Sequence, residues 1–270
     1  SMYASANPTL SDHLQLSFIG SGPDFFRDQV RREVKYGGDF IKVFISGSFL
    51  SPDGGPDVCY LSDDELEMII RTAHELNRPV TAHVYPCEMM RKLLKFGIDG
   101  MEHGALMDEE TAELFEKKNT YLVPTFSPFQ DIIEENEEFV AKNTEDAQRK
   151  LRKYAPILRK SREVIKNSKI RLGFGSDFCA VHQPYESCYE YRSWLRSGMD
   201  PFRTLKAATS VNAEILGIDH LTGTIEKGKM ADIAGWSRDL LTDPEALFQC
   251  DFVMKEGVQY PTDSKVVDCL

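Results

Sequence analysis

The sequence lacks the marks of several protein classes. Its six cysteines are widely scattered and form no CxxC pair, which argues against a zinc ribbon or a disulfide framework and favours a reducing compartment. No apolar run approaches the ~18 residues needed to cross a membrane, and no charged-then-apolar leader opens the chain. We therefore expect a cytoplasmic protein with no membrane partner.

Positive charge is also scarce. The chain has 32 Lys+Arg against 43 Asp+Glu, which gives a net charge of -11. An acidic surface repels the phosphates of nucleic acids and anionic lipids, so neither is expected as a partner. This balance fits an ordinary enzyme acting on small molecules.

A third absence concerns histidine. Four apolar segments each end in a group able to bind a metal, and each is followed by a helix-like stretch, so all four groups should lie at the carboxyl ends of parallel strands, where α/β barrels place their chemistry. A site of this kind normally needs a further pair of histidines from an earlier strand, yet no His-X-His occurs. The set nevertheless indicates a metal-dependent hydrolase. Its members are Lys42 in residues 40–46, His83 in 80–85, His103 in 100–105 and Asp177 in 170–177.

The order of patterns predicts the fold class. With 270 residues, 41% of them hydrophobic, the chain can bury one large core. Apolar strand patterns alternate with charged amphipathic helix patterns, which is βα alternation. The predicted strands cover residues 2–6, 40–46, 80–85, 100–104, 120–126 and 170–176. The predicted helices cover residues 24–36, 62–76, 86–96 and 108–118, with Ser62 and Asp108 as N-caps.

Two later regions complete the predicted organisation. Residues 131–167 are highly charged and helical in pattern, and we expect them to cover or flank the mouth of a barrel. After a helix at 210–216, residues 231–237 and 252–258 resemble short antiparallel strands. We therefore place a domain boundary near Gly217, with a hydrolase barrel in residues 1–217 and a small β appendage in residues 218–270.

Lys42 is unusual for its position. Strand alternation puts Phe40, Lys42 and Phe44 on one face, and both faces of a strand in a parallel barrel are buried. A buried ammonium must lose its charge or find partners. One possibility is an ion pair with a carboxylate in the core. The other is carbamylation by CO2, which creates an anionic oxygen ligand able to bridge two divalent ions, and histidines on the following strands favour it.

The remaining candidate ligands also have alternatives. A lone histidine in an apolar strand is more often a hydrogen-bonded core residue than a ligand, but His83 and His103 lie on consecutive strands, each at the carboxyl end. Asp177, which ends Gly-Ser-Asp, is either a turn residue with an Asx cap or a ligand. Histidine nitrogen and carboxylate oxygen both bind zinc well, and open coordination positions would make the site catalytic.

Seven segments carry a resemblance to a known family and span most of residues 36–260. The chain resembles the amidohydrolase superfamily, most closely its imidazolonepropionase-like and Xaa-Pro or Xaa-Arg dipeptidase branch. The segments are Phe-Ile-Lys-Val-Phe-Ile-Ser-Gly, Thr-Ala-His-Val-Tyr, Met-Glu-His-Gly, Leu-Val-Pro-Thr, Gly-Ser-Asp-Phe, Lys-Ala-Ala-Thr-Ser-Val-Asn-Ala-Glu-Ile-Leu-Gly and Gly-Thr-Ile-Glu-Lys-Gly-Lys-Met-Ala-Asp-Ile.

The resemblance implies a (β/α)8 TIM-type barrel and a role for each residue. Lys42 would be the carbamylated bridging ligand, and His83 and His103 would bind the second of two divalent ions, zinc being the expected metal. Asp177 would ligate the first metal and shuttle the proton. By the same analogy, Tyr85 would polarise the scissile carbonyl and His182 would lie near the substrate.

The chain also departs from the family. Members carry His-X-His on the first barrel strand, preceded by half of a β-sandwich whose other half is the C-terminal appendage, and neither feature is present. We therefore expect an incomplete barrel that lacks its first two strands. Open strand edges favour pairing with another chain. The expected partner is a second copy of the chain or an amino-terminal fragment that completes the barrel.

The function implied is hydrolysis of amide or peptide-like C–N bonds by metal-activated water, with Asp177 as proton shuttle. Dipeptides, N-acyl amino acids and cyclic amides are the substrate classes. The alternative is a catalytically impaired fragment, with one metal or none, that acts as a binding or scaffold barrel. Loops set specificity in this fold, so the residues do not name the substrate.

Overall fold

The computed structural model describes residues 2–3, 19–49, 55–177 and 188–262. The chain divides into two compact units, Ser1–Leu172 and Gly173–Leu270. This division does not test the predicted boundary near residue 217, which stays a prediction.

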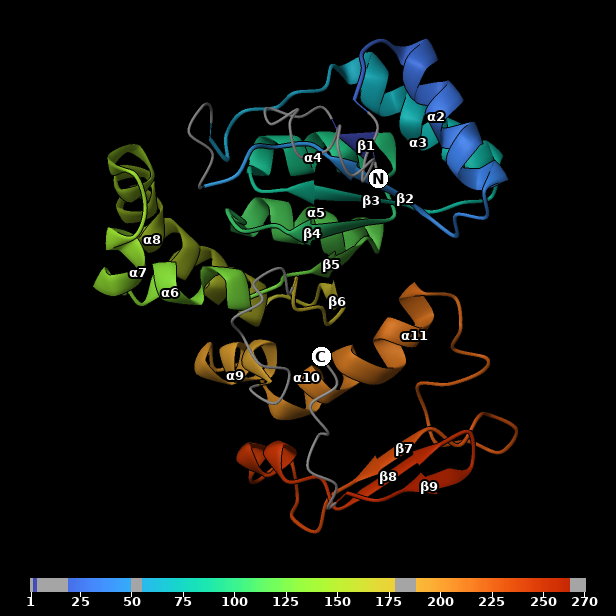
Figure 1. The fold of residues 1–270 in the computed structure, drawn as a ribbon. Coiled ribbons are helices and arrows are strands. Elements are labelled where there is room, and N and C mark those ends of the chain that lie inside the picture. The colour runs from blue at the N-terminus through green and yellow to red at the C-terminus, as the bar shows by residue number, and fades with distance from the viewer. Residues whose placement is uncertain (1, 4–18, 50–54, 178–187, 263–270) are drawn as a thin grey trace. The chain divides into compact units, whose positions relative to one another are not determined.

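The first unit is built on a parallel sheet. Among the described residues, the sheet has six strands that lie in chain order, and every neighbouring pair is parallel (Figure 1). The predicted α/β fold with a parallel sheet is thereby confirmed, and closure of the sheet into a barrel stays a prediction. The strands are β1 (Met2–Tyr3), β2 (Ile41–Phe44), β3 (Val80–Val84), β4 (Gly100–His103), β5 (Tyr121–Val123) and β6 (Arg171–Leu172).

Helices alternate with these strands as predicted. They begin where the sequence places its caps: Asp108 accepts a hydrogen bond from Thr111 N at 2.8 Å, and Ser62 N donates to Glu65 at 2.8 Å. The helices are α2 (Pro23–Lys35), α3 (Asp63–Glu75), α4 (Cys87–Phe96) and α5 (Glu109–Lys118).

Residues 131–167 form three helices rather than one continuous stretch. Glu135 has a φ of 54°, which ends α6 (Gln130–Ile133). Asn136 then caps α7 (Glu137–Ala141), and Thr144 caps α8 (Glu145–Asn167). A short 3-10 turn, Ser127–Phe129, precedes α6. The charged pattern was helical throughout, but the N-cap residues divide it.

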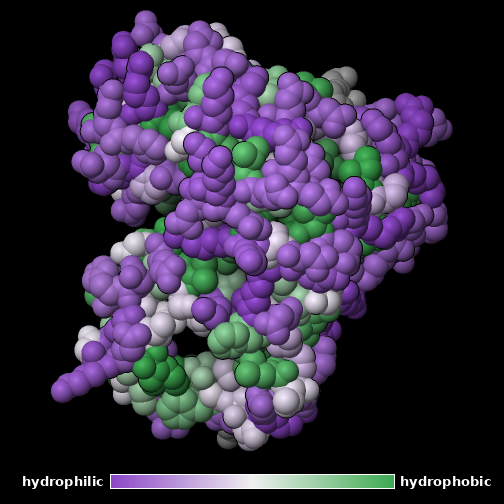
Figure 2. Space-filling model, turned by 180° about the vertical axis from the view of Figure 1, so that it is seen from behind, coloured by the Kyte–Doolittle hydropathy of each residue, from purple (hydrophilic) through white to green (hydrophobic). Residues whose placement is uncertain are grey.

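The core of the first unit lies between the sheet and the helices. Ile41 and Val43 of β2 are buried, whereas Lys42 and Phe44 are half-buried, so the predicted alternation of faces is present. Figure 2 shows that hydrophilic side chains cover much of one face of the molecule, as expected for a chain with 28% charged residues. No helix among the described residues is long and apolar enough to span a membrane. The described cysteines are free thiols.

The second unit combines helices with a small antiparallel sheet. A π-helical turn, Ala207–Val211, joins α10 (Pro201–Lys206) to α11 (Asn212–Ile215). The predicted antiparallel strands are present, but residues 252–258 form a hairpin rather than one strand. Glu256 and Gly257 have φ values of 52° and 82°, which a two-residue hairpin turn requires. The elements are α9 (Tyr189–Arg196), α10 (Pro201–Lys206), α11 (Asn212–Ile215), a 3-10 helix (Pro244–Phe248), β7 (Ile233–Gly235), β8 (Phe252–Lys255) and β9 (Val258–Tyr260).

The buried carboxylate of Glu65 gives a test of the packing of α2 and α3. It accepts hydrogen bonds from Ser62 N and from Gly22 N, at 2.8 and 2.6 Å. We expect Glu65→Ala to lower the free energy of unfolding by ~1–3 kcal/mol, because two backbone N–H groups lose their acceptor. Glu67→Ala, on an exposed position of the same helix, should change it by less than ~0.5 kcal/mol. Equal effects in urea titrations would contradict this account.

Candidate active site

The structure brings His83 and His103 together at the carboxyl ends of β3 and β4. Both side chains are buried, and their ring centroids are 4.5 Å apart. The register pairs His83 with Glu102, so regular alternation would turn His103 to the other face of the sheet. Instead, His103 has a φ of 69°, which takes its backbone out of the extended region as the strand ends. That backbone turn lets the two imidazoles meet.

Left-handed backbone recurs where the strands end. Thr125 follows β5 with a φ of 44°, and Asp177 follows β6 along the chain with a φ of 48°. Such conformations are costly for residues other than glycine, above all for a β-branched threonine, and they cluster at functional sites. Within the first unit, His103 and Thr125 thus make the carboxyl ends of β4 and β5 a candidate functional site.

Thr125 also determines which ring nitrogen of His103 carries the proton. Its Oγ1 lies 2.6 Å from His103 Nδ1 and donates to Pro124 O at 2.8 Å. Since a hydroxyl has one proton and a carbonyl can only accept, Nδ1–H must donate to Thr125. His103 Nε2 then carries a lone pair, the state in which histidine binds a metal.

Burial keeps both imidazoles neutral. It lowers the pKa of His83 to about 3, and the nearby charge of Lys42 adds to the effect. The pKa of His103 is also well below its ordinary value, because of burial first and then of His83 and Lys42. At neutral pH the pair therefore presents the neutral form that metal ligation requires.

Lys42 of β2 has a carboxylate partner. Its Nζ pairs with Glu102 Oε2, and Thr81 Oγ1 donates to Glu102 Oε1 at 2.7 Å. The arrangement is the ion pair considered as one alternative for a buried lysine. Carbamylation of Lys42 stays a prediction. Glu102 is absent from the candidates named from sequence, and its only signal there was its position beside His103 in Met-Glu-His.

Aromatic side chains surround the imidazoles. The ring of Tyr85 lies 4.6 Å from His83 and 5.3 Å from His103, and Phe129 lies 5.9 Å from His103. Phe49, after β2, contacts Tyr85 and also Tyr154 of α8. Residues of the predicted helical region 131–167 thus pack over the carboxyl ends of the strands. Their packing leaves a cavity of about 10 Å³. Its lining includes His103, Phe126, Phe129, Ile133, Leu158 and Arg162.

The other predicted site residues lie elsewhere. Asp177 belongs to the second unit, where it is exposed. His182 lies outside the described residues. Tyr85 is buried beside both histidines, which suits a residue acting at the same site. Sequence reasoning missed Thr125, whose signal was its place in Leu-Val-Pro-Thr directly after a strand.

The donor set fits a divalent ion if Lys42 contributes. Within the described ranges, no three His, Cys, Asp or Glu side chains form a group that could hold a metal. The two neutral histidines supply two ligands, and a carboxylated Lys42 would supply the third. Neither ring nitrogen of His83 has a hydrogen bond to any residue in the described part of the chain, which leaves them available for ligation.

A parallel sheet with polar side chains gathered at the carboxyl ends of its strands is the architecture of α/β enzymes. The chain belongs to the amidohydrolase family, whose model matches residues 8–260.

Relatives of known type share the fold and part of the sequence. The ochratoxinase of Aspergillus niger is 29% identical over 226 residues, which are 83% of this chain and 46% of the relative. The crystal structure of that enzyme has a TM-score of 0.77 and covers 91% of this chain and 56% of its own. A crystal structure of a Xaa-Pro dipeptidase with bound methionine is 27% identical, with a TM-score of 0.78, and covers 90% of this chain and 59% of its own. The chain spans about half the length of the curated relatives it matches.

The buried imidazoles should make stability depend on pH. An unfolded histidine has a pKa of 6.5, above that of folded His83, so the unfolded chain binds more protons. The contribution is fully present above pH 6.5 and is lost as the pH falls from there toward about 3. In metal-free protein, we expect the slope between these pH values to approach ~1.4 kcal/mol per pH unit for each histidine.

Urea titrations from pH 7 to pH 4 would measure this slope. His83→Gln should remove up to one histidine's share of it, because the titrating group is gone. His220→Gln, at an exposed position, should leave the slope as in the wild type. A slope that His83→Gln does not reduce would contradict the burial of a neutral imidazole.

Proposed function

We propose that this chain forms the greater part of a metal-dependent hydrolase of amide or peptide-like C–N bonds. The observation that carries the proposal is the neutral pair of His83 and His103 beside Lys42 and Tyr85, in a member of the amidohydrolase family. Relatives named ochratoxinase and Xaa-Pro dipeptidase support C–N bond cleavage. The substrate classes we propose are dipeptides, N-acyl amino acids and cyclic amides.

The residues would act as follows. His83 and His103 would hold the second of two divalent ions, most suitably zinc, Asp177 would ligate the first, and a carbamylated Lys42 would be a ligand of both. When bound, such an ion lowers the pKa of water to about 7 and polarises the carbonyl. Asp177 would take the proton of the attacking water and return it to the leaving amine.

Two further side chains would bind the substrate. Tyr85 would donate its phenolic hydrogen bond to the scissile carbonyl oxygen, because its ring lies beside both imidazoles. His182 would lie near the substrate. Both roles rest on the family resemblance and on the position of Tyr85.

The histidines of the first metal would come from polypeptide outside this sequence. We propose that residues 1–217 contribute the barrel from its third strand onward and residues 218–270 part of a β-sandwich. An amino-terminal segment or a second copy of the chain would then complete both. The chain's match to only 46% of ochratoxinase is in keeping with this division.

A second candidate is a barrel that binds without turnover, with one metal or none. The ion pair of Lys42 with Glu102 favours it, because that pair satisfies the lysine without CO2 or metal. Metal content distinguishes the two candidates. Two ions per chain would support the hydrolase, one an impaired fragment, and none the scaffold.

The first test removes the lysine together with its charge partner. In Lys42→Ala/Glu102→Gln, no carboxylate is left without its ammonium, so lost metal reports the ligand. After incubation with zinc and bicarbonate, wild type should retain zinc and the double variant none, measured by atomic emission. Lys95→Ala, exposed in the same unit, should bind as wild type. A short-chain carboxylic acid should restore part of the zinc, whereas bicarbonate should not. Unchanged zinc in the double variant would exclude Lys42 as a ligand.

The second test concerns Asp177. With zinc bound and Xaa-Pro dipeptides or N-acyl amino acids as substrates, Asp177→Asn should lower kcat by ~10²–10⁴-fold, because an amide cannot take the proton. Much of the zinc should remain, since the amide still offers an oxygen. Asp219→Asn, an exposed acid in the same unit, is the matched control. Equal turnover in wild type and Asp177→Asn would remove Asp177 from the mechanism.

A further inference from the structure

Asn212 forms a pair of hydrogen bonds with the backbone of one residue. Its Oδ1 accepts from Phe174 N at 2.9 Å, and its Nδ2 donates to Phe174 O at 2.8 Å. A side-chain amide has the donor and acceptor of a peptide group, so it can replace a neighbouring strand. Residues 173–177 belong to no strand of the described sheets, although they follow β6 directly. Asn212 therefore supplies the backbone partner that a sheet would otherwise provide.

A π-helical turn sets the direction of Asn212. Ala207–Val211 forms this turn, and Asn212 begins α11 immediately after it. The wider turn inserts one residue relative to an α-helix, which rotates all that follows by about 100°. Such turns are rare and frequent at functional sites. A regular helix through the same residues would point the Asn212 amide elsewhere.

The π-helical turn is held by close packing. Gly223 has a φ of 92°, and a Cβ at this position would lie 2.5 Å from Ala213 Cβ and 3.3 Å from Thr209 O. Only glycine lets the chain pass there. Thr209 Oγ1, in the turn, donates to Leu205 O of α10 at 2.7 Å. The turn, and with it Asn212, is thus fixed against the loop that carries Gly223.

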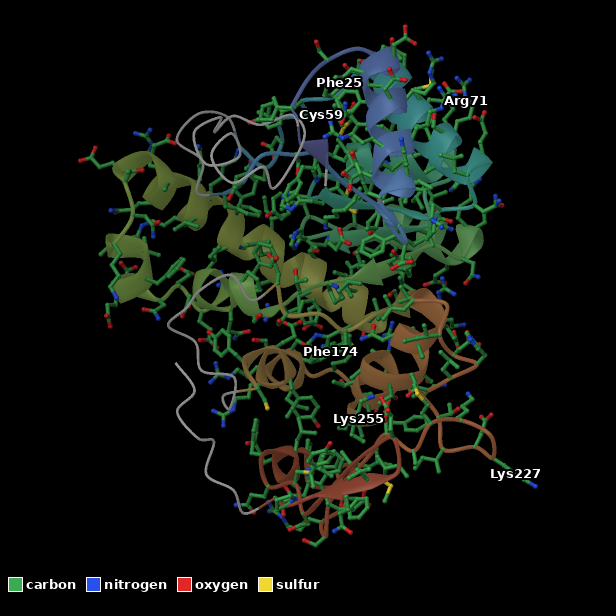
Figure 3. The ribbon with its side chains drawn as sticks, turned by 45° about the vertical axis from the view of Figure 1, so that its right-hand side comes forward. Phe25, Cys59, Arg71, Phe174, Lys227 and Lys255 are labelled. Atoms are coloured by element: carbon green, nitrogen blue, oxygen red, sulfur yellow. The ribbon has the colours of Figure 1, made fainter. Side chains whose placement is uncertain are left out.

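Phe174 is fixed through its side chain as well. Its ring, labelled in Figure 3, lies 5.3 Å from the fully buried ring of Trp194. Trp194 Nε1 donates to Glu190 Oε1 at 2.6 Å. Backbone and side chain of Phe174 are therefore both anchored, three residues before the left-handed backbone of Asp177.

We propose that Asn212 is a positioning residue for Asp177. A residue in the left-handed region keeps that conformation only when its surroundings over-determine it. The amide pair at Phe174 provides an anchor on the amino-terminal side of Asp177 in the same unit. The inference rests on the proposed role of Asp177 in hydrolysis and assigns the control of its geometry to the Asn212 amide.

Hydrogen exchange tests the anchor without any need for turnover. In Asn212→Ala, the amides of residues 174–177 should exchange at least ~10-fold faster than in wild type, as expected for a local opening. Asn212→Asp keeps the acceptor for Phe174 N and loses the donor to Phe174 O, so its exchange should fall between the two. Glu214→Ala, at an exposed position of α11, is the matched control and should resemble wild type. Faster exchange at Phe174 alone, with residues 175–177 unchanged, would overturn the proposal.

Kinetics supply the second measurement. If the zinc-bound chain hydrolyses amides, Asn212→Ala should lower kcat ~10–10²-fold with KM within about twofold, because misplacement of an acting group affects the chemical step. Asn212→Asp should recover part of kcat. Unchanged kcat in Asn212→Ala would overturn the proposal. Absence of turnover in wild type would count against the proposed function instead, and the exchange experiment would still decide the role of Asn212.

Discussion

Burial of two uncharged imidazoles at the carboxyl ends of adjacent parallel strands is the constraint on which the site depends. Desolvation disfavours the imidazolium and lowers the pKa of both His83 and His103, so the folded chain holds the two imidazoles in their neutral, ligand form at neutral pH. The apolar surroundings come from Phe44, Tyr85 and Phe129, whose rings contact the histidines. The segments after β2 and β5 and helix α8 cover the two imidazoles. By burying them, this cover lowers their pKa as well as packing against them.

The departures from regular backbone have a related cause. The middle of each strand follows the parallel ladder, and the irregular conformations begin where the strands end. His103 leaves the extended region to face His83, and Thr125 does so while accepting the Nδ1–H of His103. The two strained residues are thus bonded to each other, so the free energy lost in one backbone conformation is offset by a contact that the other makes possible. The strained backbones of His103 and Thr125 and the orientation of the His103 imidazole therefore depend on the same hydrogen bond.

Local patterns predicted the elements and the faces of the strands, because hydrophobic periodicity and N-caps are local. Alternation in residues 40–46 correctly placed Lys42 and Phe44 on one face, but that face is half-buried and not buried as expected. Asp108 caps its helix as expected. The pairing of Lys42 with Glu102 needed the register of three strands, which no local pattern contains. The Asn212 amide pair likewise depends on a π-helical turn. The hairpin at Gly257 had a local signal, a glycine within an apparent strand, which indicates a turn.

The charge on Lys42 links its modification to metal binding. As an ammonium it balances Glu102, and the pair is neutral. A carbamate in the same place would change the local charge from zero to minus two beside a half-buried carboxylate, which is unfavourable in a medium of low polarity. A divalent ion would restore neutrality. Two positive charges beside an unmodified ammonium would in turn repel. The two neutral states are the ammonium without metal and the carbamate with a divalent ion, and the protein stabilises these over the carbamate alone or a metal beside the ammonium. Under the proposed chemistry, CO2 and metal should therefore bind cooperatively, each weakly alone.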